Sequence, residues 1–511
     1  MIYEGIRDAC GRSAILGALS GSFEKLGHSI AEAGRRSVIV MAVKPFFARF
    51  DMCRAMRDRS VLCYAASVVY GWLLAVVRAV YRAFSHAWLF RCLTKFADWL
   101  IGLRICNICA VLLAVMLCVD DSRWSNGYML IAAFFVGALY LVQQATSREE
   151  KRASLPVSLY LFMGISALAV FGGIFVSEAI RVFSYFVTSF IFMLVLAGSV
   201  RDMQDFRRVF MILYTAVFFT SVYSLLQSLD GIAVNTSYTD VANNSDMIGR
   251  AYATFYNPNN FAEILVLLTP CSFVAFMTEE RLSKAAKVLI GFSFVLPVVA
   301  LMLTYSRGAW ISFALSVGAF VAIANLKLIP VFIILAVMAI PFLPTSIINR
   351  VMSLFTGNDT SMGYRLYIWE ASLKALGADP LTGGGLGTSN FFDAYRKFMV
   401  PEACVATHAH NMYLEIWLET GLFGFLSIVT LYLSTLKNTL LAAVRENRGF
   451  RYAAIAMFST LFGMFFIEMV EYIWFYPRVM LVFWSVMGLA WALLRSVDGR
   501  ERCERINSAV D

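Results

Sequence analysis

The chain has 511 residues, of which 60% are hydrophobic and only 15% are charged. A water-soluble protein of this length could not bury so much apolar side chain, so the composition excludes the soluble class and predicts a membrane protein. The net charge of +9 does not indicate nucleic-acid binding, because the basic residues lie between apolar stretches and not on one continuous face.

The apolar stretches predict an all-α polytopic membrane protein with about twelve transmembrane helices, because a spanning helix needs about 20 apolar residues. The predicted spans lie at 105–118 (extended by the preceding Trp99–Leu103), 127–143, 157–176, 179–199, 209–226, 261–277, 288–304, 309–325, 328–345, 412–435, 453–469 and 473–493. A large, partly helical outer loop precedes the tenth span.

The lysines and arginines predict the orientation through the positive-inside rule. The first 104 residues hold 15 of them, and the predicted inner connections and tail hold 18, against 10 on the outer side. Both ends of the chain are therefore predicted in the cytoplasm. The segment 61–77 is apolar enough to cross, but we expect it to lie on the cytoplasmic surface. A pair of crossings in this region is the alternative.

These assignments divide the chain into five regions. They are a basic cytoplasmic or interfacial region (1–104), spans one to nine (105–345), an extracytoplasmic catalytic loop (346–411), spans ten to twelve (412–493) and a cytoplasmic tail (494–511).

Two outer segments, 227–260 and 346–411, are longer than the 12–15 residues of an ordinary connection, and such loops commonly carry function. The second contains a helical pattern over 362–376, with Leu366, Trp369, Leu373 and Leu376 at helical spacing. A glycine run, Gly383–Gly387, comes after it. Backbone N–H groups of such a run can bind phosphate, but the run lacks the Lys-Ser/Thr of a P-loop, and a flexible turn explains it better.

Several side chains near the outer face could carry chemistry. His408 and His410 stand where the loop meets the tenth span, and histidine can take a proton from a hydroxyl near neutral pH. No third ligand of suitable spacing is near them, so no metal site is predicted. Arg307 lies in a tight outer turn, where it either has an anionic partner or reaches lipid headgroups. Arg365 lies in the loop helix, where a solvated face is the alternative.

Three acidic residues, Glu263, Glu415 and Glu419, fall in the first turns of predicted spans. Acidic groups at membrane depth usually face the protein interior and are candidates for function. The alternative is that they pair with the outer arginines and hold the loop in place.

The order of five short motifs resembles that of the O-antigen ligase and polymerase superfamily, bacterial membrane enzymes that handle undecaprenyl-diphosphate-linked glycans. The motifs are ATFYNPNNFA (252–261), YSRGAW (305–310), the R-x-x-x-W of Arg365 and Trp369, GGGLGTSN (383–390) and the H-x-H-N-x-Y-L-E string 408–415. The resemblance covers about 250–435, and residues 1–104 have no counterpart in the family pattern.

The resemblance implies an enzyme that moves a glycan from an undecaprenyl-diphosphate carrier to a glycan or lipid-core acceptor. The site would be extracytoplasmic, in the bacterial inner membrane, and would need neither metal nor cofactor. Arg307 and Arg365 match the family's two arginines, whose planar cations suit a departing diphosphate. His410 matches the essential histidine, the general base. The implied substrate contacts are His408, Asn411, Glu415, Trp369, Tyr305, Asn257, Asn259 and Gly385.

Two alternatives to a ligase remain. A repeat-unit polymerase of the same superfamily shares the donor chemistry and differs in the acceptor. A lipid-linked oligosaccharide flippase or transporter also has about twelve spans. It would need charged residues at mid-membrane and internal repeats, whereas the conspicuous charges here gather on one side.

Overall fold

The computed structural model describes residues 60–84, 88–147, 155–232, 249–352, 360–445 and 448–507. Within these ranges every regular element is a helix, which confirms the predicted all-α membrane fold. Ten helices there are long and apolar enough to cross a membrane. They are α4 (Val61–Phe84), α7 (Asn126–Thr146), α9 (Val176–Ser199), α10 (Met203–Asp230), α11 (Pro258–Thr278), the continuous pair α12 (Lys284–Ser293) and α13 (Val295–Leu303), α14 (Arg307–Asn325), α19 (Met412–Arg445), α20 (Arg448–Ile467) and α21 (Pro477–Asn507).

The predicted count of twelve spans is not confirmed in the described ranges. The predicted span at 157–176 holds only the 13 residues of α8 (Val157–Ala169), about 20 Å of helix. The predicted spans at 309–325 and 328–345 share one helical run, in which α14 continues through a 3-10 turn (Leu326–Leu328) into α15 (Ile329–Ala339). Hydropathy reports where a chain is apolar, not where a helix stops or bends, and this explains the difference.

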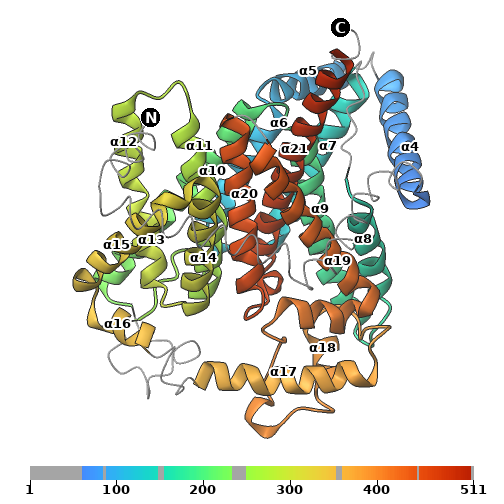
Figure 1. Ribbon diagram of the computed structural model, residues 1–511. Coiled ribbons are helices and arrows are strands. Elements are labelled where there is room, and N and C mark those ends of the chain that lie inside the picture. The colour runs from blue at the N-terminus through green and yellow to red at the C-terminus, as the bar shows by residue number, and fades with distance from the viewer. Residues whose placement is uncertain are drawn as a thin grey trace.

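The N-terminal region contains one upright helix and one that lies across the bundle. α4, which covers the apolar segment 61–77, stands beside α7 and α8 and has the length of a spanning helix (Figure 1). α5 (Trp88–Gly102) is bent by 83° from α6 (Ile105–Cys118), next to Arg104 with its left-handed φ of 68°. The surface placement predicted for 61–77 therefore fits α5 better. Residues 1–59 of the predicted basic region lie outside the described ranges.

The core of the bundle is built around α21, which packs most extensively against α9. A Cβ atom on Gly488 of α21 would stand 2.5 Å from the carbonyl oxygen of Met193 on α9, so only glycine permits this close approach. Beside it the buried rings of Phe190 and Trp484 meet edge to face, with centroids 4.7 Å apart. Close packing of this kind replaces the hydrophobic driving force that helices lack in lipid.

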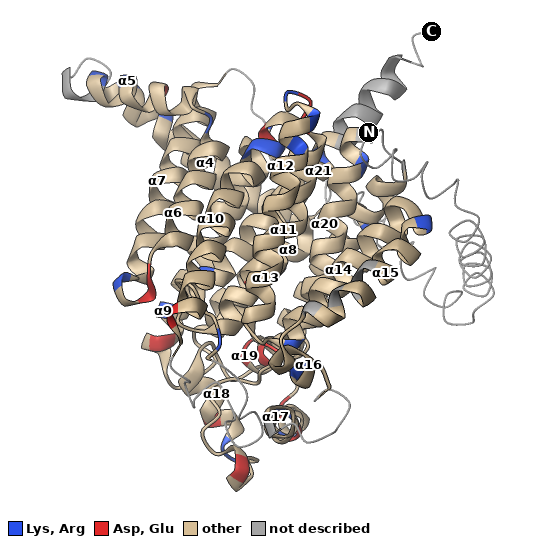
Figure 2. Cartoon of the chain, turned by 90° about the vertical axis from the view of Figure 1, so that its left-hand side faces the viewer, with Lys and Arg blue, Asp and Glu red and all other residues tan. Residues whose placement is uncertain are grey.

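The two ends of the bundle differ in charge and in structure. Most of the lysines and arginines lie at the end that carries α5 and α12, whereas acidic residues lie near α17 (Thr360–Ala378) and α18 (Thr388–Tyr395) at the other end (Figure 2). Under the positive-inside rule, this charge distribution is the one expected if the α17 end faces outward.

The described part of the loop 346–411 forms a small core of its own at the α17 end. α17 contains the predicted helix 362–376, and it packs through Ile368 and Leu376 against Phe391 and Tyr395 of α18. The predicted apolar face is only partly right, because Leu366 and Leu373 are exposed. α16 (Thr345–Met352) leads into this loop, and the loop returns to the bundle at the start of α19 (Figure 1).

Candidate active site

The connection between α20 and α21 brings one carboxylate, that of Glu471, to the end of the bundle beneath α17. Its Oε1 accepts hydrogen bonds from Nη2 of Arg365 and from Nδ2 of Asn259, the latter at 2.9 Å. Its Oε2 lies 3.4 Å from Nδ1 of His410. Residues from three separate motifs therefore meet on one side chain, of which only 12% is exposed.

Glu471 is held in its ionised form. Burial acts to raise the pKa of its carboxyl group, but the charge of Arg365 and the hydrogen bond with His410 outweigh burial, and the pKa is about 2. A carboxylate can only accept hydrogen bonds, so Nδ1 is the ring nitrogen of His410 that would donate to it. In that tautomer of the neutral ring, Nε2 carries the lone pair.

The R-x-x-x-W motif of α17 reaches the site through both of its defining residues. Arg365 donates to Glu471, and its Nη1 also donates to Ser361 Oγ at 3.3 Å. Trp369, one helical turn later, donates from Nε1 to the carbonyl oxygen of Ala409 at 3.0 Å. The motif thus fixes α17 to the segment that carries the histidine pair.

His410 is held in a strained backbone conformation at the end of this segment. Its φ is 45°, in the left-handed region that residues other than glycine seldom adopt. Its N–H donates to Nδ1 of His408 at 3.2 Å, and the N–H of Ala409 donates to Oε2 of Glu415 at 2.6 Å. These bonds leave 27% of the His410 side chain exposed, which is enough for a substrate to reach it.

His408 has a different environment from His410. Its ring is buried, with the ring of Phe475 4.3 Å away and that of Tyr472 6.0 Å away between centroids. Burial, followed by the nearby His410, lowers the pKa of His408 to about 3. His408 is therefore neutral and acts as a hydrogen-bond acceptor that holds the backbone of His410.

The turn before α14 places Arg307 beside the connection that carries Glu471. Arg307 is the first residue of α14 and is buried, with 8% of its surface exposed. A Cβ atom on the next residue, Gly308, would stand 3.2 Å from Val470, the neighbour of Glu471 in the chain. Tyr305 has a left-handed φ of 52°, and its hydroxyl lies 2.9 Å from that of Ser346 on α16.

A further arginine, Arg250, enters the site from the segment before α11. It is buried, and its Nε donates to the carbonyl oxygen of Thr304 at 2.7 Å. Its Nη2 donates to Oδ1 of Asn259 at 2.5 Å. The Asn259 side chain therefore joins Arg250 to Glu471, since its Nδ2 donates to that carboxylate.

Arg307, Arg350 and Arg365 lie close enough to Arg250 to affect its ionisation. Burial, and then the charge of Arg350, lower the pKa of Arg250 to about 9, and the charges of Arg365 and Arg307 act in the same direction. The charge of Glu471 opposes them. Cations so concentrated create a strong field for an anionic ligand.

Two asparagines of the predicted site fix turns. Asn411 caps α19, because its Oδ1 accepts from backbone N–H groups of the first helical turn, and its Nδ2 donates to Met469 O at 2.9 Å. Asn257 caps α11 in the same way and donates from Nδ2 to the hydroxyl of Tyr476 at 2.7 Å. Both bind the connection between α20 and α21, so they position the Glu471 segment.

The glycine run and the acidic pair of α19 form a clamp. The N–H of Gly385 donates to the Glu419 carbonyl oxygen at 3.1 Å, and that of Gly387 donates to Glu419 Oε1 at 2.8 Å. A Cβ atom on Gly385 would stand 2.6 Å from Gly173 N. The glycines thus permit close packing, and the amide of Gly385 that could bind phosphate already has a protein acceptor. Among the described residues, Glu415 and Glu419 accept hydrogen bonds and form no ion pair with an arginine, which differs from the alternative prediction.

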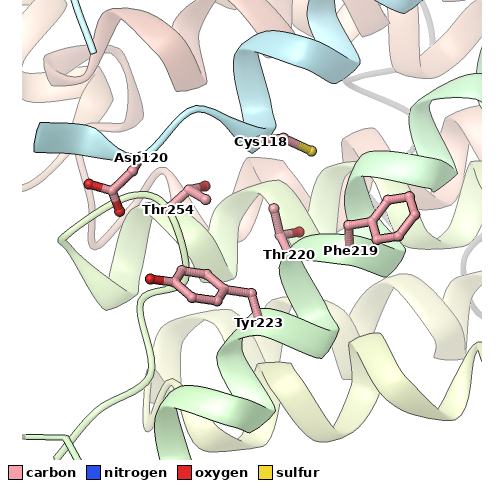
Figure 3. Close-up of a pocket in the computed structure, with 6 residues that line it drawn as sticks. All are labelled: Cys118, Asp120, Phe219, Thr220, Tyr223 and Thr254. Carbon is pink, nitrogen blue, oxygen red and sulfur yellow. The ribbon is translucent and has the colours of Figure 1, made fainter. Parts of the chain in front are cut away.

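A pocket of about 280 Å³ opens near the C-terminal ends of α6 and α10 (Figure 3). Six residues line it: Cys118, Asp120, Phe219, Thr220, Tyr223 and Thr254. None of them is a predicted site residue. The volume lies below the range of about 300–1,000 Å³ typical of small-molecule sites.

Sequence reasoning missed Glu471, Arg250 and Arg350. Glu471 had a signal of the same kind as Arg307, a charged residue in a short connection between two apolar helices. Arg250 is the single basic residue in the outer segment 227–260. Arg350 had no distinguishing signal.

Comparison with known proteins agrees with the motifs. Residues 292–429 match the family model described as O-antigen ligase, a range that includes Arg307, Arg365 and His410. An uncharacterized protein of Haemophilus influenzae is 30% identical over 169 residues, which are 28% of this chain and 42% of that protein. A Rickettsia conorii protein named "Putative polysaccharide ligase" is 26% identical over 148 residues, 27% of this chain and 32% of its own length.

The matches thus span less than half the length of each relative. Within the chain, the family match covers the helices and the loop that carry the three predicted catalytic residues. The described residues contain ten candidate spanning helices, so the chain is a multi-pass membrane protein, and its residues 292–429 are similar to the O-antigen ligase family.

Proposed function

We propose that the protein transfers a glycan from an undecaprenyl-diphosphate carrier to an acceptor hydroxyl at the outer face of the bacterial inner membrane. The single observation that carries this proposal is the convergence of Arg365 and His410 on Glu471 at the loop-bearing end of the bundle. A fixed cation and a base stand side by side there, and the reaction needs one of each.

The arginines serve the departing diphosphate. As the bond between the sugar and the diphosphate breaks, negative charge grows on the phosphate oxygens, and preorganised cations stabilise that charge without reorganising. Arg365 and Arg307 come from the family-matched range, and Arg250 and Arg350 add to the same field. In this proposal the guanidinium groups supply the charge compensation that a metal ion supplies in other transferases.

His410 serves the acceptor. As the acceptor oxygen bonds to the anomeric carbon, its proton passes to Nε2 of His410. The carbon–oxygen bond to the carrier breaks, and its electron pair leaves with the diphosphate. Attack opposite the leaving group inverts the anomeric configuration. The 27% exposure of the ring is consistent with this role, whereas buried His408 is not placed to meet an acceptor.

The location at the end of the bundle suits a substrate with a long polyprenyl tail. The tail stays in the bilayer between helices, while the diphosphate reaches the polar rim. The flippase alternative receives no support from the site, because its charged cluster of Arg250, Arg307, Arg350 and Arg365 lies at the end of the bundle that carries α17. A repeat-unit polymerase would use the same donor site, and the acceptor alone separates it from a ligase.

The test replaces His410, Arg307 and Arg365 by Ala, one at a time, in cells that lack the native protein. Surface polymer should disappear while carrier-linked glycan accumulates on the outer leaflet. Arg396→Ala is the matched control, because Arg396 belongs to the same loop but pairs with Asp393 at 2.6 Å on the surface. Unchanged polymer in all three variants would refute the enzymatic proposal.

The same gels separate the alternatives. Single repeats in place of long chains would identify a polymerase, and long chains left on the carrier would identify a ligase. Intermediate trapped on the cytoplasmic leaflet would instead identify a flippase.

A further inference from the structure

The two carboxylate oxygens of Glu471 contact different residues. Oε1 accepts from Arg365 and from Asn259, whereas Oε2 faces His410 at 3.4 Å. The contact with Arg365 is the closer one, and the contact with His410 is longer than the 2.7–3.2 Å of an ordinary N–H···O bond. The carboxylate is therefore drawn toward the arginine and away from the base.

We propose that Glu471 is a positioning residue whose carboxylate, before the donor binds, occupies the site on Arg365 that the donor's diphosphate will take. When the diphosphate binds to Arg365, the carboxylate of Glu471 becomes free to bind His410. The inference rests on the proposed function, because it requires a diphosphate to bind where the arginines gather. The proposed exchange also sets the order of binding: the carboxylate of Glu471 binds His410 only after the donor has bound to Arg365.

The exchange is chemically matched. A carboxylate and a phosphate present paired oxygens to the same guanidinium fork, so a diphosphate can replace Glu471 on Arg365. An arginine whose side chain is only 16% exposed is costly without an anion, and Glu471 offsets that cost before the donor binds. A diphosphate brings more negative charge than one carboxylate, which favours the exchange when the donor arrives.

The remaining contact of Oε1 keeps Glu471 near the base after the exchange. Asn259 still donates to Oε1 at 2.9 Å, and its own side chain is held by Arg250 at 2.5 Å. The carboxylate therefore cannot swing away and can close the 3.4 Å gap to His410. Catalytic hydrogen bonds that are long in an empty enzyme commonly tighten when substrate binds.

The charged and titratable groups that face His410 come from every side of the ring. Glu471 lies at Nδ1, and Arg365 stands on the same carboxylate. The ring of His408 is 4.0 Å away and that of Tyr364 on α17 is 6.5 Å away, between centroids. His408 is neutral and Tyr364 carries no charge near pH 7, so Glu471 and Arg365 set the electrostatics of the base.

The decisive variant is Glu471→Gln in the full chain, purified in detergent. Gln keeps the shape but removes the anion that competes with the donor. Binding of undecaprenyl diphosphate should tighten by about 5-fold or more, the usual scale of coupling between two ligands. Turnover should fall by about 10–100-fold, as expected when a residue that orients a catalytic group is lost. A purely structural role would instead weaken binding and turnover together.

Three controls isolate the effect. Undecaprenol, which has the tail but no phosphate, should bind equally well to both proteins. Glu468→Gln changes a buried carboxyl of the same connection that contacts Tyr413 at 3.2 Å, and it should not tighten binding of undecaprenyl diphosphate. Glu471→Asp keeps the charge but is too short to reach both partners, so it should lower turnover without tightening binding.

The outcomes separate this inference from the proposed function. If Arg365→Ala and His410→Ala lose transfer but Glu471→Gln binds undecaprenyl diphosphate no more tightly than the native protein, only the inference fails. If Glu471→Gln does not fold, tighter binding by Glu471→Asp would overturn the inference, because the anion is still present. If the arginine and histidine variants retain transfer, the proposed function itself fails.

Discussion

Two groups of buried carboxylates lie on either side of the histidine segment, and they act differently. Glu471 accepts from Arg365 and faces His410, so it lies within the charged cluster. Glu415 and Glu419 accept from the backbone N–H groups of Ala409 and Gly387 and lie within the clamp. The same side-chain type handles charge on one side and holds backbone on the other. The neighbouring residues determine which of these two roles a carboxylate has, because a buried carboxylate is stable only when donors satisfy its oxygens.

This contrast predicts opposite sensitivities. Removing charge should be severe within the arginine cluster, whereas removing a hydrogen-bond acceptor should be severe within the clamp. Four predictions, in order of decreasing effect, examine that difference.

The largest effect should come from His410→Ala. Loss of a general base typically costs about 10²–10⁴-fold in rate, so transfer measured with purified protein should fall by that factor. The midpoint of thermal unfolding in detergent should change little, because the ring is partly exposed and its Nδ1 contact is long. A fall in rate of less than about 10-fold would show that His410 is not the general base.

Arg365→Lys should be the next most damaging change. Lysine keeps the charge but loses the planar fork, and removing one preorganised donor to a developing anion costs about 10²–10³-fold. The rate of transfer at saturating donor is the measurement. Arg396→Lys, in the surface pair with Asp393, is the control and should retain its activity. Equal rates for both variants would show that Arg365 contributes only its positive charge and not the geometry of its guanidinium group.

Glu415→Ala examines the clamp. The N–H of Ala409 would lose its acceptor in a buried place, which costs about 1–3 kcal/mol of stability. The thermal midpoint should fall, and transfer at low temperature should fall much less than in His410→Ala. Glu415→Gln retains an acceptor oxygen and should stay close to the native protein. Severe loss of transfer in Glu415→Gln would mean that charge matters on this side too.

The smallest effect on transfer should come from His408, which gives the stability of the protein a pH dependence. Its pKa is about 3 in the folded protein, against an ordinary value of 6.5, so the unfolded chain binds the extra proton first. Stability is therefore complete above pH 6.5 and falls as the pH drops toward 3, by at most about 1.4 kcal/mol per pH unit. Thermal midpoints between pH 7 and 5 measure it. His408→Asn keeps an acceptor for the His410 N–H and should flatten the slope.

Much of the site could be predicted because short motifs carry its parts. Arg307, Arg365 and His410 were singled out because they match motifs of the family that the sequence resembles, and the structure brings Arg365 and His410 onto one carboxylate. Glu471 lies 61 positions from His410 in the chain and belongs to no such motif. Its role depends on the packing of α20 and α21 against the loop, which no local pattern encodes.

The fold was predicted in class but not in count for a related reason. Apolar stretches identify helices, yet the bend at Arg104 and the early end of α8 depend on backbone geometry. The glycine run likewise looked like a phosphate cradle, although its amides bind α19. In each case the local sequence indicates the kind of element, but contacts with residues distant in the sequence determine the structure that it adopts.

The left-handed backbone at His410 has a practical consequence. A φ of 45° strains any side chain, but glycine adopts it without cost, so His410→Gly should fold at least as well as His410→Ala. The missing ring would leave a space beside Glu471 that opens to the surface. Imidazole added to the medium could enter that space and accept the acceptor's proton. Chemical rescue of the glycine variant by imidazole would then separate the base from the scaffold that holds it.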